Sequence, residues 1–340
     1  MKSMFNTSSA VMVLLLLTPI DSQAWGYRGH HVICSIASRL VQTKGLDAFM
    51  RLRCENLGYL CNVPDVIWKA QGEDQNRVGS PTHYVNPEKF GFTLSTMPTS
   101  VEEVFLKASN RDPSQERKRF FSEVGTLWFR GNQFFERAVS SLNTGAKSKA
   151  PSSKSEEQDA SLDYNKGIYE FFLNLGFMGH FVGDASMPYH ATVDYDGRQT
   201  GHDGIHAYYE EALVAELNSD DMNTIEKKAA KLTHRLPRNP SGDLDVVGTL
   251  KWLTIQVQSD RKAIESKDRY IDSNEKVRGA PRRNLHLFRK LIIKQLALSA
   301  YVQARLIEAA HKKSEAPIDF SKYRSYRFDA APTFVSPDYF

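Results

Sequence analysis

The stretch from Ile168 to His190 constrains the fold most, because one helix there would carry both a core face and metal-binding side chains. Apolar residues recur at helical spacing, which predicts a helix with one buried face: Ile168, Phe171, Phe172, Leu175, Met178 and Val182. His180 and Asp184 are four residues apart, so they project from the same side of that helix. Pro188 ends the helical pattern and turns His190 out of register.

A second pair with the same spacing follows. His206 and Glu210 are four residues apart at the start of another helical pattern, and a polar, glycine-bearing loop between His190 and His206 is expected to form one wall of a site. Convergent imidazole and carboxylate groups are costly to bury unless a cation lies among them. The two pairs therefore predict a metal site.

The first 24 residues are predicted to be a signal peptide. Lys2 precedes an apolar run, Ala10 to Leu17, that is too short to cross a membrane, and Ser22-Gln23-Ala24 offers small residues for cleavage. A retained anchor is the less favoured alternative. Since no later segment reaches transmembrane length without polar interruption, we expect an exported protein, periplasmic or secreted, that has no transmembrane anchor after cleavage.

The remaining chain, residues 25–340, is predicted to be one all-α, mainly helical domain. Residues 145–162 have almost no large apolar side chains and are expected to be a flexible surface insertion, whereas the aromatic tail, residues 317–340, is expected to pack on the body. A helical pattern spans about Pro113 to Leu142. The net charge of +4 does not by itself indicate nucleic-acid binding.

Three cysteines are present. Cys54 and Cys61 bracket six residues, and a local disulfide between them is predicted for an exported protein. Cys34 lies between Ile33 and Ile36 in a helical pattern and is predicted to be a buried, small apolar residue.

Four further candidate ligands lie in the first half of the mature chain. Cleavage would give Trp25 a free α-amino group, whose lone pair is accessible to a metal near neutral pH, and His30 begins the helical pattern that follows. Asp65 follows Pro64 in the first turn of a predicted helix, and His83 lies on a Pro-bounded extended segment or loop. The full candidate set is Trp25, His30, Asp65, His83, His180, Asp184, His190, His206 and Glu210.

In this order and context the candidates resemble the ligands of the zinc-dependent phospholipase C / S1-P1 nuclease superfamily. The resemblance extends from the Trp-Gly-x-x-Gly-His motif at Trp25 to about Glu211. It implies an exported helical phosphodiesterase with three zinc ions. It also implies three ligand sets: Trp25, His30 and Asp184 for one zinc; Asp65, His83, His180 and the bridging Asp184 for the second; and His190, His206 and Glu210 for the third.

The resemblance also implies the chemistry. The zinc ions would activate a water molecule for attack on phosphorus and neutralise phosphate oxygens, and Asp65 would orient or deprotonate the nucleophile. The reaction would be the hydrolysis of a phosphodiester.

The branches of the superfamily differ in substrate, and the sequence has features of both. Three features resemble the phospholipase C branch: Glu210 and the segments Pro-Thr-His-Tyr and Met-Pro-Tyr-His-Ala. The short spacing between Trp25 and His30 resembles the nuclease branch instead. We expect a phospholipase C that acts on phosphatidylcholine-like lipids at a membrane surface. The alternatives are a single-strand nuclease and 3′-nucleotidase, or a non-catalytic exported zinc-binding protein.

Three tyrosines are candidates for substrate contacts: Tyr84, Tyr189 and Tyr195. They could hold a quaternary ammonium by cation–π contact or stack nucleic-acid bases, and any one of them could instead pack in the core. His31 and His202 are predicted to support the site or lie on the surface, and not to be further ligands.

Overall fold

The structure is a computed structural model that describes residues 25–108, 113–314, 318–325 and 332–339. The predicted signal peptide, residues 1–24, lies outside the described residues. The prediction of an all-α fold is confirmed, since the strands in the described part of the chain are a short antiparallel hairpin, β1 (Tyr270–Asp272) and β2 (Val277–Arg278).

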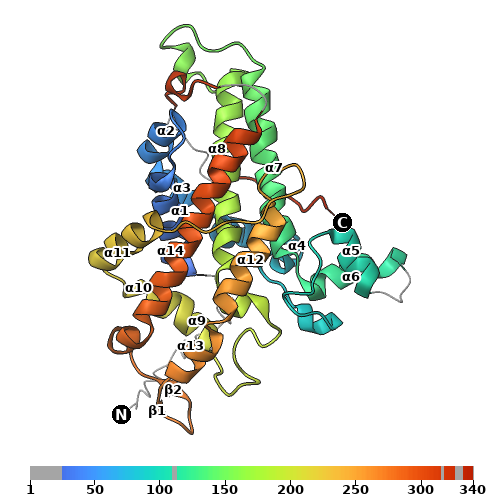
Figure 1. Cartoon of the computed structure of the whole chain (residues 1–340), viewed down its shortest axis with the longest axis vertical. Helices are drawn as coiled ribbons and strands as arrows, with labels where there is room; N and C mark the ends of the chain where they lie inside the picture. Colours follow the sequence, from blue (N-terminus) through green and yellow to red (C-terminus); the bar gives the residue numbers. More distant parts are fainter. Residues whose placement is uncertain (1–24, 109–112, 315–317, 326–331, 340) are drawn as a thin grey trace, which may run out of the picture.

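In chain order the helices form an N-terminal group, a central pair and a C-terminal group, and in Figure 1 α1 to α3 lie on one side of the central pair and α5 and α6 on the other. The N-terminal group is α1 (Gly26–Leu40), α2 (Leu46–Leu52), α3 (Cys54–Leu60), α4 (Glu73–Gly79), α5 (Val101–Ala108) and α6 (Pro113–Val124). The central pair is α7 (Leu127–Ala146) and α8 (Asp163–Ala185). The C-terminal group is α9 (Ile205–Ala207), α10 (Leu213–Ala215), α11 (Ser219–Ala230), α12 (Val246–Gln258), α13 (Arg261–Lys267) and α14 (Pro281–Lys313).

Helix α8 is the centre of the molecule. It packs against α7 along its length and is also contacted by α1, α3, α12 and α14, so its residues from Leu175 to Ala185 are all buried. The helices α7 and α8 approach closely where Gly145 meets Gly167, because a Cβ atom on Gly167 would lie 2.5 Å from the Gly145 Cα. The predicted helix that carries His180 and Asp184 is therefore present and rigidly enclosed.

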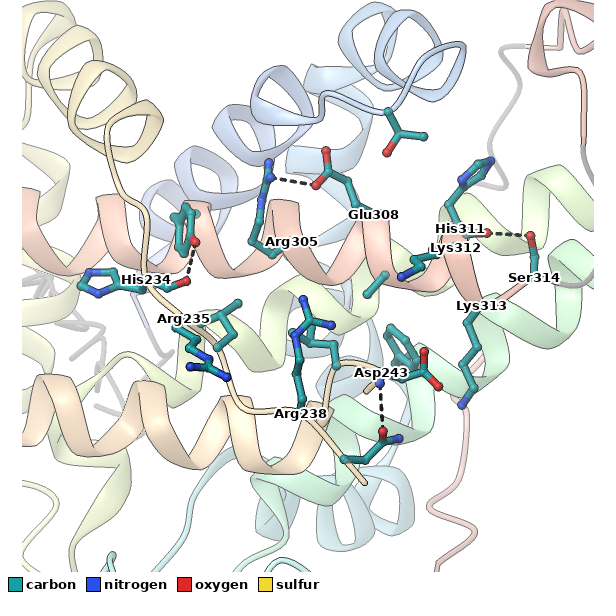
Figure 2. Close-up of a pocket in the computed structure, with 17 residues that line it drawn as sticks. His234, Arg235, Arg238, Asp243, Arg305, Glu308, His311, Lys312, Lys313 and Ser314 are labelled. Carbon is teal, nitrogen blue, oxygen red and sulfur yellow. Dashed lines mark hydrogen bonds and ion pairs between the residues drawn. The ribbon is translucent and has the colours of Figure 1, made fainter. Parts of the chain in front are cut away.

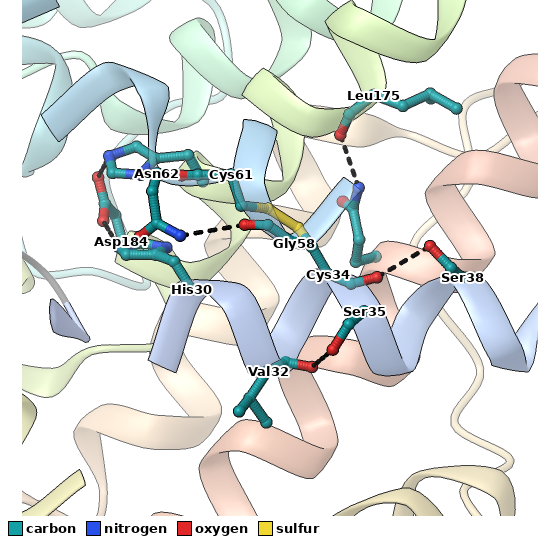
Figure 3. Close-up of a disulfide and its surroundings, with 12 residues drawn as sticks. His30, Val32, Cys34, Ser35, Ser38, Gly58, Cys61, Asn62, Leu175 and Asp184 are labelled. Atoms are coloured by element: carbon teal, nitrogen blue, oxygen red, sulfur yellow. Dashed lines mark hydrogen bonds and ion pairs between the residues drawn. A yellow bond between two sulfur atoms is a disulfide. The ribbon is translucent and has the colours of Figure 1, made fainter. Parts of the chain in front are cut away.

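The disulfide joins Cys34 to Cys61, so the predicted pairing of Cys54 with Cys61 is wrong (Figure 3). Cys54 begins α3 and Cys61 follows its last residue. At 1.5 Å per residue the two are about 10 Å apart along the helix, which exceeds the span of a disulfide. Cys34 lies on α1, which packs against α3, and its Cα atom is 6.5 Å from that of Cys61.

Two local predictions also need correction. The helical pattern from Pro113 to Leu142 is interrupted at Gly125, whose φ is +77° and whose Cβ position would lie 2.1 Å from the Tyr84 carbonyl oxygen. Only glycine fits there, and the chain starts a new helix, α7, at Leu127. His83, predicted to lie on an extended segment or loop, ends a short 3₁₀ turn, Ser80–His83, and the extended backbone begins only at Tyr84.

The segment 145–162 and the tail contact one another. Ala146 still belongs to α7, the Arg324 main-chain N–H donates to the Glu157 carbonyl oxygen at 2.9 Å, and the side chains of these two residues form an ion pair. In the tail, Phe320 and Tyr323 are buried. None of the described helices is both long enough and apolar enough to cross a bilayer.

Candidate metal centre

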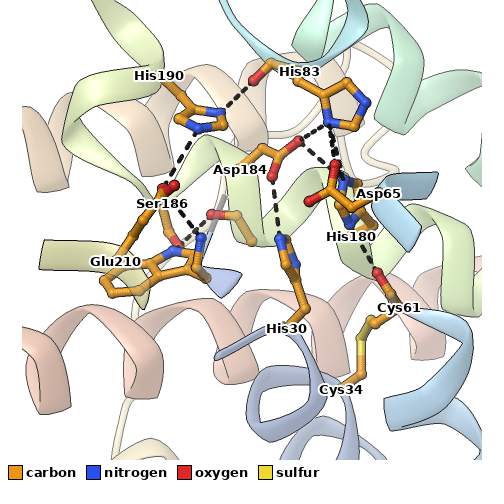
Figure 4. Close-up of polar contacts among 12 residues, drawn as sticks. His30, Cys34, Cys61, Asp65, His83, His180, Asp184, Ser186, His190 and Glu210 are labelled. Carbon is orange, nitrogen blue, oxygen red and sulfur yellow. Dashed lines mark hydrogen bonds and ion pairs between the residues drawn. A yellow bond between two sulfur atoms is a disulfide. The ribbon is translucent and has the colours of Figure 1, made fainter. Parts of the chain in front are cut away.

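Helix α8 places Asp184 at the centre of a cluster of histidines and carboxylates. Asp184 Oδ1 lies 3.4 Å from His30 Nε2, while Asp184 Oδ2 lies 3.0 Å from His83 Nδ1 and 3.4 Å from His180 Nε2. Figure 4 shows Asp184 between His30 on one side and His83, His180 and Asp65 on the other. Each carboxylate oxygen therefore faces a different set of imidazoles, an arrangement that suits a carboxylate shared by two cations.

A first group of candidate ligands comprises His30, His180 and Asp184. His30 lies one turn into α1, and its ring stacks on that of His180 with centroids 4.1 Å apart. Gly183 allows this approach, since a Cβ atom there would lie 2.6 Å from His30 Nδ1.

A second group comprises Asp65, His83 and His180. Asp65 lies in a turn of π-helix, Pro64–Trp68, and its Oδ1 atom is 3.6 Å from His83 Nδ1 and 3.8 Å from His180 Nε2. The two ring nitrogens that face each other, His83 Nδ1 and His180 Nε2, are 3.0 Å apart. These atoms converge as ligands of one ion would.

The third group comprises His190, His206 and Glu210. His190 lies on a 3₁₀ turn, Pro188–Ala191, and its Nε2 atom is 3.7 Å from Glu210 Oε2. His206 is in α9 and Glu210 in the π-helical turn Tyr208–Ala212 that continues it, so the spacing of four brings His206 Nε2 to 2.9 Å from the same oxygen.

Trp25 contacts the third group. Its main-chain nitrogen lies 3.3 Å from Glu210 Oε2, and its carbonyl oxygen accepts the first hydrogen bond of α1, from Gly29 N at 2.9 Å. The indole Nε1 donates to Ser186 Oγ at 2.9 Å. The structure thus brings all nine predicted ligand residues into one buried region, with the Trp25 nitrogen nearest to Glu210 and His30 nearest to Asp184.

Main-chain carbonyls orient two of the histidines. His180 Nδ1 is 2.8 Å from the Cys61 carbonyl oxygen, and His190 Nδ1 is 2.5 Å from that of His83. A proton on Nδ1 leaves the Nε2 lone pair free to point at the cluster, which is how metal-binding histidines are usually fixed. The Cys34–Cys61 disulfide holds the chain segment that supplies one of these carbonyls.

Burial governs the charges in the cluster. It lowers the pKa values of His83 and His180 well below the ordinary value and, with the neighbouring His206, lowers the pKa of His190 to about 4. Burial likewise lowers the pKa of His206 to about 4. These imidazoles are neutral near pH 7, which is the form that binds metal.

The carboxylates of the cluster lack a positive charge to balance them. Burial, and the nearby charges of Asp65 and Glu210, raise the pKa of Asp184 well above its ordinary value. Asp184 Oδ1 and Asp65 Oδ2 are buried without a hydrogen-bond donor in the described part of the chain. A cation would satisfy both oxygens and reverse the shift at Asp184, so the residues present fit metal ions bound by nitrogen and oxygen ligands.

Lys69 is a site residue that the sequence analysis missed. Its Nζ atom is 2.8 Å from Asp65 Oδ1, and its side chain is 19% exposed. Burial alone would raise the pKa of Asp65, but the charge and the hydrogen bond of Lys69 hold it below the ordinary value. The i,i+4 spacing of Asp65 and Lys69 was the available signal, because it places both side chains on one helical face.

A pocket of about 620 Å³ opens over the cluster. Its lining includes three site residues, His83, His190 and His206, and the neighbouring polar side chains Lys69, Lys89, Asp196 and Arg198. Tyr84 and Tyr195 line the same pocket, and Tyr195 is 53% exposed. Tyr189 also borders it but has no exposed surface, so this tyrosine packs in the floor and is the least suited of the three to contact a substrate.

Two arginines hold the loop between His190 and His206. Arg261 donates to Thr192 Oγ1 at 2.9 Å and to Asp194 Oδ2 at 2.8 Å. Arg278 donates to the carbonyl oxygens of His202 and Asp203 and forms an ion pair with Asp268. The loop is therefore a fixed wall of the pocket.

The two histidines predicted not to be ligands lie outside the three groups. His202 Nδ1 is 2.9 Å from Asp268 Oδ2, and His31 Nε2 is 3.0 Å from Glu55 Oε2. His202 thereby helps to fasten the pocket wall, whereas His31 lies toward the surface.

No family model matches the chain. The chain is similar to a probable serine protease of Bradyrhizobium tropiciagri, with 23% identity over a region that covers 76% of this chain and 39% of that protein. The chain thus spans about 39% of the length of that relative.

Proposed function

We propose that this chain is a zinc-dependent phosphodiesterase of the phospholipase C type. The observation that carries the proposal is the set of three buried histidine–carboxylate groups, two of which are joined through Asp184, beneath an open pocket. Histidine and carboxylate ligands without cysteine suit catalytic zinc, whereas structural zinc sites are usually closed cages of four ligands. The non-catalytic alternative is therefore less well supported.

The proposed ligands are the nine residues of the sequence analysis, from Trp25 to Glu210, with the Trp25 nitrogen next to Glu210 of the third group. When bound there, zinc ions supply Lewis acidity toward phosphate oxygens and lower the pKa of water. The lowered pKa keeps Asp65 ionised, so its carboxylate can orient an attacking water molecule. Lys69 keeps Asp65 ionised and, as a pocket residue, can neutralise charge on a phosphate oxygen.

Two pocket residues support a lipid with a cationic head group. Tyr195 is 53% exposed, and Asp196, whose Oδ2 atom lies 3.6 Å from Arg198 Nε, lines the same pocket. A quaternary ammonium is attracted both to an aromatic face and to a carboxylate. Such a head group would lie beside the metal centre when the phosphodiester is over it, and the lipid tails would stay at the membrane surface.

Cations in the same pocket support the runner-up, a single-strand nuclease. Lys89 is exposed, and Arg198 also lines the pocket, although Arg198 is paired with Asp203 at 2.9 Å. Such side chains could follow a nucleic-acid backbone while Tyr84 or Tyr195 stacks a base. The partial neutralisation of Arg198 is why we place the lipid first.

The name of the bacterial relative raises serine protease activity as a third hydrolytic function. A serine protease needs a serine hydroxyl in hydrogen-bond reach of a histidine. Ser186 follows Asp184 by two residues, and its hydroxyl accepts a hydrogen bond from the Trp25 indole and donates one to the Gly183 carbonyl oxygen. This geometry does not favour the protease function.

We also propose that the protein is exported and acts in the periplasm or outside the cell. The Cys34–Cys61 disulfide supports this, because disulfides persist mainly in oxidising compartments. The signal peptide, residues 1–24, would be removed before the protein acts, leaving Trp25 as the first residue.

The proposal is tested by assaying the protein, purified after export, on phosphatidylcholine and on denatured DNA, with and without a chelator. We expect release of phosphocholine that a chelator abolishes and zinc restores. Cleavage of DNA without cleavage of lipid would select the nuclease instead. Absence of both activities in a protein that retains bound zinc would support the non-catalytic alternative.

A further inference from the structure

A pocket of about 790 Å³ is separate from the metal centre. It shares no lining residue with the pocket over the metal centre. It lies between the C-terminal half of α14 and the segment 231–245, which joins α11 to α12 (Figure 2). We call it the basic pocket because of the side chains described next.

Positive charge predominates around the basic pocket. Its lining contains five cationic side chains and two carboxylates: Arg235, Arg238, Arg305, Lys312 and Lys313 against Asp243 and Glu308. Arg305 pairs with Glu308 at 2.8 Å, and Lys313 pairs with Glu136 at 2.7 Å.

The other three cations of the basic pocket keep their charge available. Arg235, Arg238 and Lys312 have no carboxylate within 4.0 Å among the residues that the structure describes, and all three are exposed. A concave surface lined by charge of one sign concentrates counter-ions. An anion in this pocket would therefore meet cations that are not already neutralised.

The two walls of the pocket are held in place. The Tyr301 hydroxyl on α14 donates to the His234 carbonyl oxygen at 2.9 Å, which fastens the segment 231–245 to the helix. Within that segment Arg238 Nη1 donates to the Gly242 carbonyl oxygen at 2.6 Å, and Asn239 N donates to the Asp243 carbonyl oxygen at 2.9 Å. The pocket is thus organised before a ligand binds, which lowers the entropic cost of binding.

The floor of the pocket is apolar. Phe135, Leu236 and Tyr301 line it and are almost fully buried.

The helix dipole explains only some of the cations. Lysines in the last turn of a helix are common because they interact favourably with its dipole, which accounts for Lys312 and Lys313 on α14. The dipole does not account for Arg235 and Arg238, which belong to the facing segment.

We propose that the basic pocket is a second ligand site that binds an organic anion with a phosphate group and an apolar portion. The guanidinium groups of Arg235 and Arg238 match the oxygens of a phosphate, Lys312 adds charge from the opposite wall, and the apolar portion lies on Leu236 and Tyr301. Such a ligand can come from two sources, a soluble organic phosphate or the head group of an anionic phospholipid.

The test compares the zinc-loaded full chain with two triple variants. The first, R235Q/R238Q/K312Q, removes the unpaired cations of the pocket. The matched control, R282Q/R283Q/K290Q, removes three exposed cations from the N-terminal half of α14 that line neither the basic pocket nor the pocket over the metal centre.

Two measurements separate the two sources of ligand. Calorimetry with 1-naphthylmethylphosphonate, whose carbon–phosphorus bond resists hydrolysis, measures the binding of a soluble organic phosphate analogue. Co-sedimentation with phosphatidylcholine vesicles, with and without phosphatidic acid, measures the lipid source.

We expect the pocket variant to bind at least about tenfold more weakly than the wild type, to the phosphonate or to the phosphatidic acid vesicles, while the control binds like the wild type. Because all three proteins have the same metal centre, binding there cancels in the comparison. Equal binding by the pocket variant and the wild type would overturn the proposal, as would an equal loss in the control. Circular dichroism verifies that the pocket variant is folded, and its phosphodiesterase activity is expected to be unchanged.

Discussion

The main-chain nitrogen of Trp25 lies 3.3 Å from Glu210 Oε2, inside the cluster of predicted ligands. If the chain is cut before Trp25, this nitrogen becomes an α-amino group next to the third ligand group. Adding one glycine before Trp25 of the mature chain would replace the amine by an amide, which is a poor metal ligand. We expect the bound zinc to fall by about one ion per chain and the activity to fall with it, measured by elemental analysis and phosphocholine release.

The control for this experiment is a glycine added after Phe340, which should change neither quantity. Full zinc content in the protein extended at Trp25 would show that the terminal nitrogen is not a ligand.

Asp184 and His206 should differ in the number of ions they hold. Asp184 Oδ1 faces His30 and Asp184 Oδ2 faces His83 and His180, whereas His206 belongs to the third group alone. We expect Asp184→Asn to lose about two zinc ions per chain and His206→Ala about one, measured by elemental analysis after dialysis. An equal loss in both variants would contradict the shared role of Asp184.

Lys69 should matter more to activity than Lys89, although both line the pocket. Lys69 Nζ contacts Asp65 at 2.8 Å and is mostly buried, whereas Lys89 is exposed at the rim. We expect Lys69→Gln to lower kcat/KM on the phosphodiester by about a hundredfold, because it removes a preorganised positive charge from the reacting phosphate. Lys89→Gln is the matched control, and a similar loss in that variant would argue against a specific role of Lys69.

The central helix and its ligands were predictable because their signals are periodic. The apolar face from Ile168 to Val182 and the spacing of His180 and Asp184 follow from the geometry of one helix, and the complete burial of α8 from Asn174 to Ala185 is consistent with both. The distant ligands Asp65 and His83 have no such local signal. Their inclusion rested on the resemblance of the whole set, and the structure places them within 4 Å of His180 or Asp184.

What the sequence did not predict depends on tertiary contacts. The disulfide partner of Cys61 is on α1, 27 residues away, and only the packing of α1 against α3 brings it close. Gly125 ends a helix because Tyr84 approaches it from another segment. The basic pocket joins α14 to the 231–245 segment, and no local pattern in either segment predicts that they face one another.

The disulfide should stabilise both the fold and the metal centre. It closes a loop of 27 residues, for which chain-entropy arguments give about 3 to 4 kcal/mol, and the Cys61 carbonyl oxygen accepts a hydrogen bond from His180 Nδ1. We expect Cys34→Ser to lower the free energy of unfolding by about that amount and also to weaken zinc binding, measured by urea denaturation and competition with a chelator. Cys54→Ser removes the free cysteine and is expected to change neither.

Asp268 should make the free energy of unfolding depend on pH below about pH 4. Burial alone would raise the pKa of Asp268, but hydrogen bonds from Arg278 and His202 outweigh it and hold this pKa below the ordinary value. A carboxyl group with a lower pKa in the folded than in the unfolded state adds stability above the unfolded pKa, about 4, and loses that contribution as the pH falls through the folded pKa. We expect Asp268→Asn to lower the free energy of unfolding by about 2 kcal/mol at pH 7, and the difference from the wild type to shrink below about pH 4.

Urea denaturation between pH 3 and pH 7 measures this difference in the free energy of unfolding, and Asp272→Asn, at an exposed position, is the control. A difference that does not change with pH would show that the Arg278–Asp268 ion pair is not its cause.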